Sequence, residues 1–338
     1  MKTLQELNEH LTAPSPGLIS DIAELNGDIL ILGIGGKMGP SLGVLARRAL
    51  DAVKKDANVF GISRFSNKEV QEQLEHSGIK TIAGDLLDED FLASLPKSEN
   101  VIFMAGQKFG TQDGEPFTWA MNTYLPGRIA HYFRKSRIVV FSTGNIYPLV
   151  SIDSGGASEK MRPGPLGEYA QSCLGRERIF QHFASIHQTP LLIFRLNYAL
   201  DLRYGVLSDV ARAVWNEDPI DLTMGYVNVI WQGDANTYAL RSLLHCNCPS
   251  TVLNITGPET IAIRWLAEEF GRLLNREPNF VSAPAQTALL SNATEAYERF
   301  GKPNVPLTDM IQWTADWIES GGTDLNKPTH FQERQGKF

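Results

Sequence analysis

The stretch Asp28-Ile-Leu-Ile-Leu-Gly33-Ile-Gly-Gly36-Lys-Met-Gly39 decides the fold of this chain. Its first half is a continuous apolar run, which is typical of a parallel strand buried on both faces. Its second half is a glycine-rich turn, after which Ser41 to Leu50 follow with the period of a helix. This order predicts a dinucleotide-binding loop, because the glycines permit a tight turn and let the backbone approach a pyrophosphate at the helix N-terminus.

The glycine spacing is Gly33-x-x-Gly36-x-x-Gly39, with Gly35 also present, rather than the G-x-G-x-x-G of ordinary dehydrogenases. A glycine triplet alone often marks nothing but a turn, but the flanking strand and helix favour the functional interpretation. We therefore expect the cofactor to contact the whole loop, which is Gly33, Gly35, Gly36, Lys37, Met38 and Gly39.

Further apolar runs alternate with helical segments downstream, which predicts an α/β fold with a Rossmann-like, doubly wound parallel sheet. We expect four regions. They are an N-terminal extension over 1–27, an NAD(P)-binding Rossmann domain over 28–195, a smaller, mainly substrate-binding region over 196–322 with some segments returning to the Rossmann domain, and a C-terminal tail over 323–338. Leu4, Leu7 and Leu11 predict a helix in the extension, whereas the sequence leaves open whether the tail is mobile or folds over the cleft.

The residues at the ends of the predicted strands favour a particular cofactor. Ser63 and Arg64 follow the second strand, where an acidic residue would bind the ribose of NAD. A hydroxyl and a cation suit a 2'-phosphate instead, so we expect NADP as the cofactor, with NAD as the alternative. If Arg64 has no functional role, it is a solvated surface arginine. Asp85 follows the third strand and could hold the adenine amine, and the small residues that end the fourth strand leave room for a ligand.

Composition excludes several classes of protein. The formal charge of −7 argues against nucleic-acid binding, and no apolar run reaches membrane-spanning length. Three cysteines are too few for a disulfide framework, which favours the reducing cytoplasm. His245-Cys-Asn-Cys248 has too few ligands for a metal clip, so no metal site is expected.

Several positions together resemble the extended or atypical short-chain dehydrogenase/reductases, the family of the NAD-dependent epimerases and dehydratases. They are Gly33-x-x-Gly36-x-x-Gly39, Asp85-Leu86, Met104-Ala105-Gly106, Asn122, Ser142-Thr143 with Tyr147, Tyr169, Phe194-Arg-Leu-Asn197 and Val227-Asn-Val-Ile-Trp-Gln-Gly-Asp234. The resemblance implies that Tyr169 is the catalytic acid or base, that Thr143 (with Ser142 as backup) polarises the same oxygen, and that Asn122 arranges the hydrogen bonds. It also implies cofactor contacts at Asp85, Leu86, Met104, Ala105, Gly106, Tyr169 and Asn197.

The sequence departs from this family at the position four residues after the tyrosine. The family has Tyr-x-x-x-Lys, whereas this chain has Tyr169-Ala-Gln-Ser-Cys173, and a neutral thiol cannot supply the positive field of a lysine. Arg176 could substitute as the cation, since it shares a helix face with Tyr169 and Cys173. Alternatively, Cys173 could be a nucleophile or ligand for other chemistry, or the protein could bind cofactor with little catalysis; a small buried residue is the ordinary interpretation of such a cysteine.

A second departure concerns the reaction. The family's dehydratases carry an acid and a base directly after the threonine, but Gly144 and Asn145 cannot transfer protons, which leaves epimerisation or simple oxidoreduction. The expected substrate is a sugar, a sugar acid or a nucleotide sugar, with Arg203 and Arg241 available for a diphosphate. Trp231 and Tyr226 could equally stack on a sugar or pack in the core. The alternative function is an NADP-binding sensor or interaction protein, and a homodimer is expected by analogy with the family.

Overall fold

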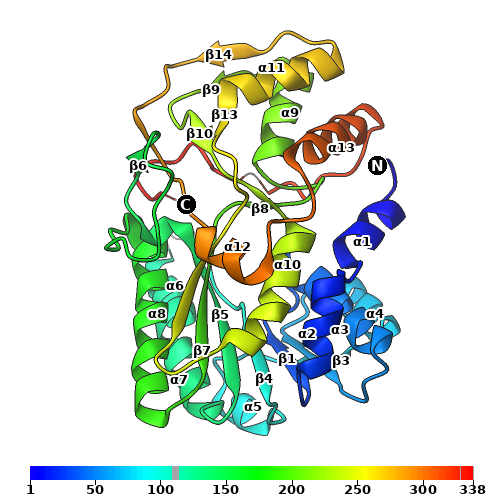
Figure 1. The fold of residues 1–338 in the computed structure, drawn as a ribbon, viewed down its shortest axis with the longest axis vertical. Coiled ribbons are helices and arrows are strands. Elements are labelled where there is room, and N and C mark those ends of the chain that lie inside the picture. The colour runs from blue at the N-terminus through cyan, green and yellow to red at the C-terminus, as the bar shows by residue number, and fades with distance from the viewer. Residues whose placement is uncertain (109–113, 328, 338) are drawn as a thin grey trace.

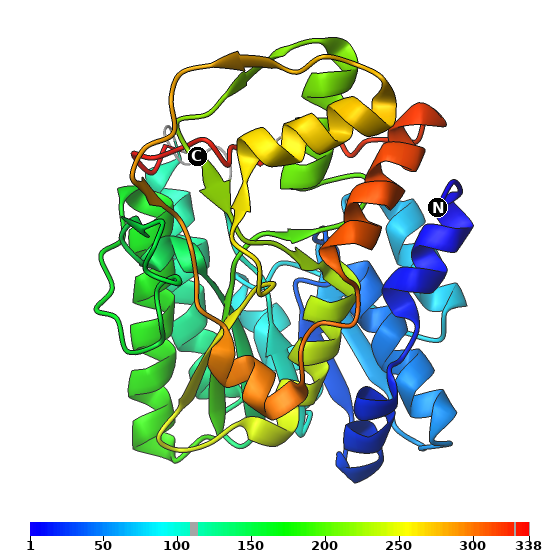
Figure 2. The same ribbon diagram turned by 45° about the horizontal axis from the view of Figure 1, so that its top comes forward.

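The computed structural model describes residues 1–108, 114–327 and 329–337. Figure 1 shows a layered α/β body in the lower half of the view and a smaller lobe above it, and Figure 2 shows the same two parts after rotation. The body is built on a seven-stranded sheet with the order β12-β7-β5-β4-β1-β2-β3, in which every pairing is parallel. Its strands are β1 (Ile29–Leu32), β2 (Val59–Ser63), β3 (Lys80–Ala83), β4 (Asn100–Phe103), β5 (Arg137–Thr143), β7 (Leu191–Leu196) and β12 (Thr251–Ile255). The expected doubly wound parallel sheet is confirmed.

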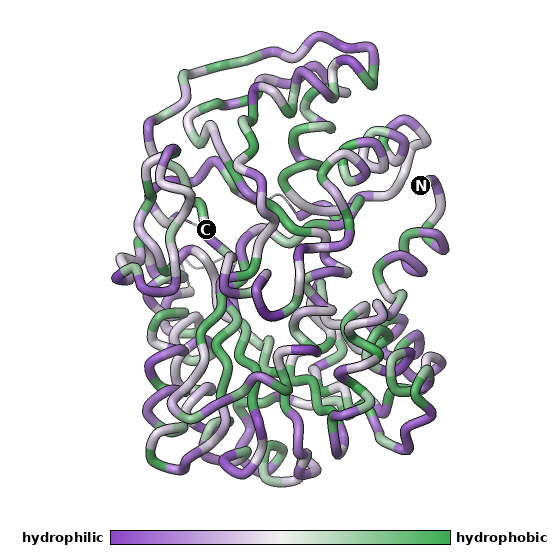
Figure 3. The backbone as a smooth tube through the Cα atoms, viewed as in Figure 1, coloured by the Kyte–Doolittle hydropathy of each residue, from purple (hydrophilic) through white to green (hydrophobic). Residues whose placement is uncertain are grey.

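The strand β1 lies between β2 and β4, where its four residues are buried. Ile29 pairs with Val59 on one side and with Asn100 on the other. Such a position explains the uninterrupted apolar sequence, because helices cover both faces of the strand. Figure 3 shows the same concentration of hydrophobic segments, in green, through the central strands.

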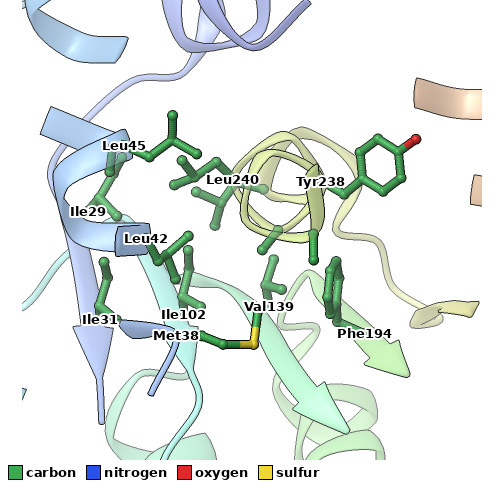
Figure 4. Close-up of a cluster of buried hydrophobic side chains, with 14 of the residues drawn as sticks. Ile29, Ile31, Met38, Leu42, Leu45, Ile102, Val139, Phe194, Tyr238 and Leu240 are labelled. Carbon is green, nitrogen blue, oxygen red and sulfur yellow. The ribbon is translucent and has the colours of Figure 1, made fainter. Parts of the chain in front are cut away.

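One face of the sheet is covered by helices from distant parts of the chain. They are α2 (Pro16–Glu24), α3 (Gly39–Ala52), α4 (Lys68–His76), α10 (Gln232–Arg241) and α12 (Thr294–Phe300). Figure 4 shows Leu42 and Leu45 of α3 facing Ile29 and Ile31 of β1, with Leu240 of α10 next to them. The opposite face is covered by α5 (Glu89–Ser94), α7 (Leu125–Tyr132) and α8 (Gly167–His187).

The N-terminal extension is part of both halves of the molecule. Its first helix, α1 (Leu4–Thr12), starts with a capping box in which Thr3 and Glu6 bond to each other's backbone, and its buried Leu7 and Leu11 join the core of the upper lobe. Leu18 and Ile22 of α2 join the core against the sheet. The extension therefore packs against both the body and the lobe, and the helix expected from its leucine spacing is confirmed.

The upper lobe is built from residues between and after the last strands of the sheet. Its helices are α9 (Val206–Asn216), α11 (Ile263–Leu274) and α13 (Leu307–Glu319), and short strand pairs connect them. These pairs are β8 (Ala199–Leu200) with β11 (Ile230–Trp231), β9 (Pro219–Asp221) with β14 (Asn279–Val281), β10 (Tyr226–Val227) with β13 (Ile261–Ala262), and β6 (Val150–Ser151) with β15 (Thr287–Ala288). Trp231 is 1% exposed and packs edge-on against Trp313, so its role is in the core.

The described part of the tail folds back over the molecule. Thr329 donates to the carboxylate of Asp209 through its backbone and its hydroxyl, and Phe331 is buried in the core of the lobe. Arg334 donates to the carbonyl of Thr287 at 2.8 Å. Of the two alternatives for the tail, the structure has the packed one.

Within the described residues, no helix combines the length and the apolar character that crossing a bilayer requires.

Candidate active site

A cavity of about 260 Å³ opens where the sheet meets the upper lobe. It lies at the carboxyl ends of β1, β4, β5 and β7, which is where ligands bind in open α/β sheets. The wall is formed by the ends of the strands, by α8 and by the segments that follow β7. The residues are Lys37 and Met38 after β1, Met104, Gly106, Gln107 and Lys108 after β4, Phe141, Ser142 and Thr143 at the end of β5 with Asn145 after it, Tyr169 and Arg176 of α8, Leu196 at the end of β7, and Asn197, Tyr198, Ala199, Tyr204, Gly205, Val206 and Thr329 beyond it.

The glycine-rich loop has the geometry that its sequence predicts. Gly33 has a φ of +94°, and a Cβ there would lie 2.7 Å from the backbone nitrogen of Ala105. A Cβ on Gly39 would collide with the carbonyl of Ile34, so the start of α3 packs directly on the loop. A Cβ on Gly36 would lie 3.3 Å from the carbonyl oxygen of Gly33, and Gly36 is exposed. In the part of the chain described, no side chain caps α3, which leaves its first N–H groups for another acceptor.

The residues that suggest the ribose and adenine contacts lie beside this loop. A Cβ on Gly35 would lie 2.5 Å from Oγ of Ser63, and Arg64 is exposed beyond it. Asp85 is exposed at the end of β3, where its carboxylate accepts the N–H of Leu87 at 2.9 Å, while Leu86 is buried. None of Ser63, Arg64, Asp85 and Leu86 is part of the wall of the 260 Å³ cavity.

The phenol of Tyr169 lies over this cavity with Thr143 and Cys173 as its hydrogen-bonding neighbours. Gly167, with a φ of +76°, begins α8 two residues before it. Burial raises the pKa of Tyr169, and the thiol of Cys173 raises it further, whereas Arg176 and the Thr143 hydroxyl lower it. The phenol is therefore protonated at neutral pH in the protein alone.

Arg176 lies beneath the same pocket and is 6% exposed. Its guanidinium donates to the carbonyl of Phe141 at 2.8 Å and to Oδ1 of Asn122 at 2.7 Å. A Cβ at Gly106 would collide with Nη2 of Arg176, which explains the glycine three residues after β4. Among the described residues, Nε of Arg176 has no hydrogen-bond partner.

Asn122 connects three elements of the site. It lies in the π-helical turn η1 (Ala120–Tyr124), which follows α6 (Glu115–Trp119) and precedes α7. Its amide accepts the N–H of Gln107 at 2.9 Å, donates to the carbonyl of Gln107 at 2.8 Å and donates to Oγ of Ser172 at 3.0 Å. Asn122 therefore fixes the loop after β4 against the helix that carries Tyr169.

Ser142 and Thr143, the two candidates for the second hydroxyl, face different environments. Oγ of Ser142 donates to Glu177 at 2.6 Å, and Glu177 forms a buried ion pair with Arg195 at 2.7 Å. Arg195 in turn donates to the hydroxyl of Tyr147 at 2.6 Å. Ser142 belongs to this buried network, whereas Thr143 is the hydroxyl that bonds with Tyr169.

The remaining candidate residues differ in where they lie relative to the cavity. Asn197 lines the cavity and donates to Oδ1 of Asn228 at 2.8 Å. Arg203 pairs with Asp201 at 2.8 Å beside the cavity, and Arg241 pairs with Asp21 at 2.7 Å away from it. Asn145, after Thr143, donates to the threonine hydroxyl at 3.1 Å and so positions it.

Sequence reasoning missed several residues that line the cavity. Lys108 comes two residues after Gly106, the last of the small residues that follow β4, and this position next to a predicted ligand site is the signal that could have identified it. Tyr198 also lines the cavity, but it lies in an irregular segment with no motif to single it out.

Comparisons with solved structures show the same fold. The UDP-glucuronic acid 4-epimerase from Bacillus cereus in complex with UDP-glucuronic acid and NAD has a TM-score of 0.70 and 18% identity, covering 86% of this chain and 99% of that one. The UDP-glucose 4-epimerase from Thermus thermophilus in complex with NAD has a TM-score of 0.69 and 16% identity, covering 86% and 99%. MoeE5 in complex with UDP-glucose and NAD has a TM-score of 0.67 and 19% identity, covering 87% and 99%.

No protein-family model matches the sequence, and no curated protein sequence matches it. At these identities, the solved structures show that the chain has the fold that the resemblance to the extended short-chain dehydrogenase/reductases implies.

Proposed function

We propose that this protein is a nicotinamide-dependent oxidoreductase or epimerase that acts on a hydroxyl or carbonyl group of a sugar, a sugar acid or a nucleotide sugar. One observation carries the proposal. The phenol of Tyr169 and the hydroxyl of Thr143 are hydrogen-bonded neighbours over a cavity at the carboxyl edge of the sheet. A glycine loop opens on the same edge, and the structures with this fold are described with NAD and UDP-sugars.

The chain fits a dinucleotide at that edge. Gly36 leaves the loop backbone open, and the first N–H groups of α3 are free of side-chain caps in the described chain, which suits a pyrophosphate. Ser63 and Arg64 suit a 2'-phosphate, so NADP is the proposed cofactor and NAD the alternative. When bound, the nicotinamide supplies the site for hydride transfer.

The side chains around the cavity supply the proton chemistry. Tyr169, protonated because burial raises its pKa, donates its proton to a substrate carbonyl oxygen and becomes a phenolate. In the reverse direction this phenolate accepts the proton of the substrate hydroxyl. Thr143 donates a second hydrogen bond to the same oxygen. Arg176 stabilises the phenolate, since it is the charge that lowers the pKa of Tyr169. We assign to Arg176 the electrostatic role that Cys173 cannot take.

A homodimer is part of the proposal. An apolar groove of about 890 Å³ runs between α5, η1, α7 and α8 and is lined by Trp119, Tyr124, Ile179 and Phe183 among others. Tyr124 is 57% exposed and Trp119 is 38% exposed, so the groove presents aromatic surface that a second copy of the chain would cover. The three free cysteines agree with a cytoplasmic location.

A single substitution tests the function. We expect Tyr169→Phe to lower turnover about 100-fold or more while cofactor affinity stays within about twofold, because the phenol transfers a proton and the phenyl ring keeps the shape. Nicotinamide absorbance and NMR of a sugar panel measure turnover, and calorimetry measures binding. Tyr297→Phe is the control, since its hydroxyl donates to the carbonyl of Thr256 away from the cavity.

The same experiment distinguishes the enzyme from the alternative function, a cofactor-binding sensor. That function is favoured only by Cys173 at the position of the family's lysine. If the purified protein binds cofactor but changes no sugar, sugar acid or nucleotide sugar, and Tyr169→Phe alters nothing, the enzyme assignment is wrong.

A further inference from the structure

The end of the chain, residues 329–337, contacts both parts of the molecule. Thr329 lines the cavity, and its backbone N–H donates to the carboxylate of Asp209 in α9 at 3.0 Å. Phe331 is 1% exposed in the core of the upper lobe. The residues that follow run to the start of α8, and Figure 2 shows them in red close to that helix. The segment therefore connects the lobe to the helix that carries Tyr169.

Arg334 anchors the middle of this segment. Its guanidinium donates to the carbonyl of Thr287 at 2.8 Å and to Oγ1 of Thr287 at 2.7 Å. It also donates to the carbonyl of Thr223 at 3.3 Å. Thr287 belongs to β15, which pairs with β6, and Thr223 lies two residues after β9. One side chain thus holds the segment against two separate stretches of the chain, through hydrogen bonds that its charge strengthens.

The backbone of Gly336 lies directly on the start of α8. Gly336 has a φ of +77° and Gly167, the first residue of the helix, has a φ of +76°. A Cβ on Gly336 would collide with the carbonyl of Leu166, and a Cβ on Gly167 would collide with the carbonyl of Gly336. The approach therefore requires a glycine on each side, because any side chain would push the two segments apart.

The first turn of α8 depends on contacts of this kind. In the part of the chain that the structure describes, no side chain caps the helix, so its first N–H groups lack the usual side-chain acceptor. Glu168 accepts a hydrogen bond from Nε1 of Trp119 at 2.5 Å, but Trp119 is exposed. Helix ends with little packing open readily, and Gly336 supplies backbone packing at this end.

The position of the Tyr169 phenol depends on the same turn. Tyr169 is the third residue of α8, and its phenol is hydrogen-bonded with Thr143. The Thr143 hydroxyl and the charge of Arg176 both lower the pKa of Tyr169. A shift of the first turn away from these two groups would raise that pKa and misalign the phenol for proton transfer.

We propose that Gly336 and Arg334 are positioning residues for Tyr169, and that the end of the chain holds the first turn of α8 in place over the cavity. The proposal rests on the proposed function, because that function assigns the proton transfer to Tyr169. It adds that the catalytic geometry includes residues more than 150 positions after the tyrosine. Cofactor binding does not depend on them, because the glycine loop is held by Ala105 and by α3.

Gly336→Ala tests the contact, and Gly321→Ala is its matched control. Gly321 has a φ of +73°, so both alanines face the same unfavourable backbone, but within the described residues no atom lies within 4 Å of a Cβ on Gly321. We expect Gly336→Ala to lower kcat about 10-fold and to leave cofactor affinity, measured by calorimetry, within about twofold. The limb of the pH–rate profile that reports Tyr169 should move to higher pH, which a purely structural role would not cause.

Two further variants remove the anchor without disturbing the core of the lobe. A chain that ends at Glu333 retains Thr329 and Phe331 and should show the same loss of kcat, about 10-fold or more. Arg334→Met should lower kcat about threefold or more, and Arg334→Lys should restore part of the loss because it keeps a charged donor.

Hydrogen exchange measured by mass spectrometry follows the helix start without any need for turnover. We expect the amides of residues 168–171 to exchange about 10-fold faster in Gly336→Ala and in the shortened chain than in the wild type, because the first turn opens more often. Gly321→Ala should leave these amides unchanged.

Three results would overturn the proposal. They are a kcat and a pH profile in Gly336→Ala and the shortened chain that match those of Gly321→Ala, unchanged exchange at the start of α8, or a loss of cofactor affinity as large as the loss of kcat. If exchange at the start of α8 rises as expected but the wild-type protein converts no carbohydrate, the proposed function fails while the positioning contact stands.

Discussion

Nη2 of Arg176 donates a hydrogen bond to Oδ1 of Asn122 at 2.7 Å, which joins the helix of Tyr169 to the π-helical turn η1. The same Oδ1 accepts the N–H of Gln107 at 2.9 Å. One amide oxygen thus fixes both the cation beneath the pocket and the loop that carries Lys108. The position of the charge near Tyr169 consequently depends on a residue 47 positions earlier in the chain.

We expect Arg176→Met to lower turnover about 10- to 100-fold, because the phenolate of Tyr169 loses the charge that stabilises it. The limb of the pH–rate profile that reports Tyr169 should move to higher pH, and Arg176→Lys should restore part of the shift. Steady-state kinetics from pH 6 to 10 measures both. Arg178→Met is the control on the exposed face of α8, and an unchanged profile in Arg176→Met would contradict the role of Arg176.

Cys173→Ala should retain turnover within about threefold and lower the free energy of unfolding by about 1 kcal/mol, because the thiol is a fully buried packing group. Burial raises the pKa of Cys173, which disfavours the thiolate that a nucleophile needs. Kinetics and thermal unfolding measure the two effects. Loss of turnover in Cys173→Ala with an intact fold would instead favour chemistry at the thiol.

The sequence predicted most strands and helices of the body but fewer of the residues that line the cavity. The strands and helices follow from local sequence patterns, whereas the cavity depends on contacts between residues far apart in the chain. The strand Ile29–Leu32 and the loop from Gly33 to Gly39 are encoded locally, by an apolar run and by glycine spacing. The shared face of Tyr169 and Arg176 also follows from helix geometry. By contrast, Thr329 reaches the cavity only because Asp209, 120 residues away, holds it there. Lys108 likewise depends on the bonds between Gln107 and Asn122.

Thr143→Val should lower turnover and spare stability, whereas Ser142→Ala should lower stability and spare turnover. Thr143→Val removes the hydroxyl beside Tyr169, so turnover should fall about 10-fold or more with little change in stability. Ser142→Ala removes a hydrogen bond of 2.6 Å to the buried Glu177, so it should lower the free energy of unfolding by about 1–3 kcal/mol and leave turnover nearly unchanged. Kinetics and chemical denaturation of both variants check the assignment; a larger catalytic loss in Ser142→Ala would reverse it.

Arg64→Ala should weaken NADP binding about 10-fold or more and leave NAD binding within about twofold, since only the 2'-phosphate needs the guanidinium. Competition calorimetry with the two cofactors measures the ratio. Lys68→Ala provides a nearby exposed cation on α4 as control. Wild-type protein that binds NAD as tightly as NADP would remove the reason for assigning this role to Arg64.

Tyr124→Glu should convert a dimer into a monomer without unfolding it. Tyr124 is 57% exposed at the apolar groove between α7 and α8, where a carboxylate would be buried against the partner's apolar surface. An exposed substitution changes the stability of a monomer by only about 0.5 kcal/mol, so the melting temperature at low concentration should barely move. Light scattering coupled to size-exclusion chromatography measures the mass, and Trp265→Glu, at a residue 44% exposed on α11, should leave the mass unchanged. A wild-type monomer, or a Tyr124→Glu protein that dimerises as tightly as wild type, would rule out this interface.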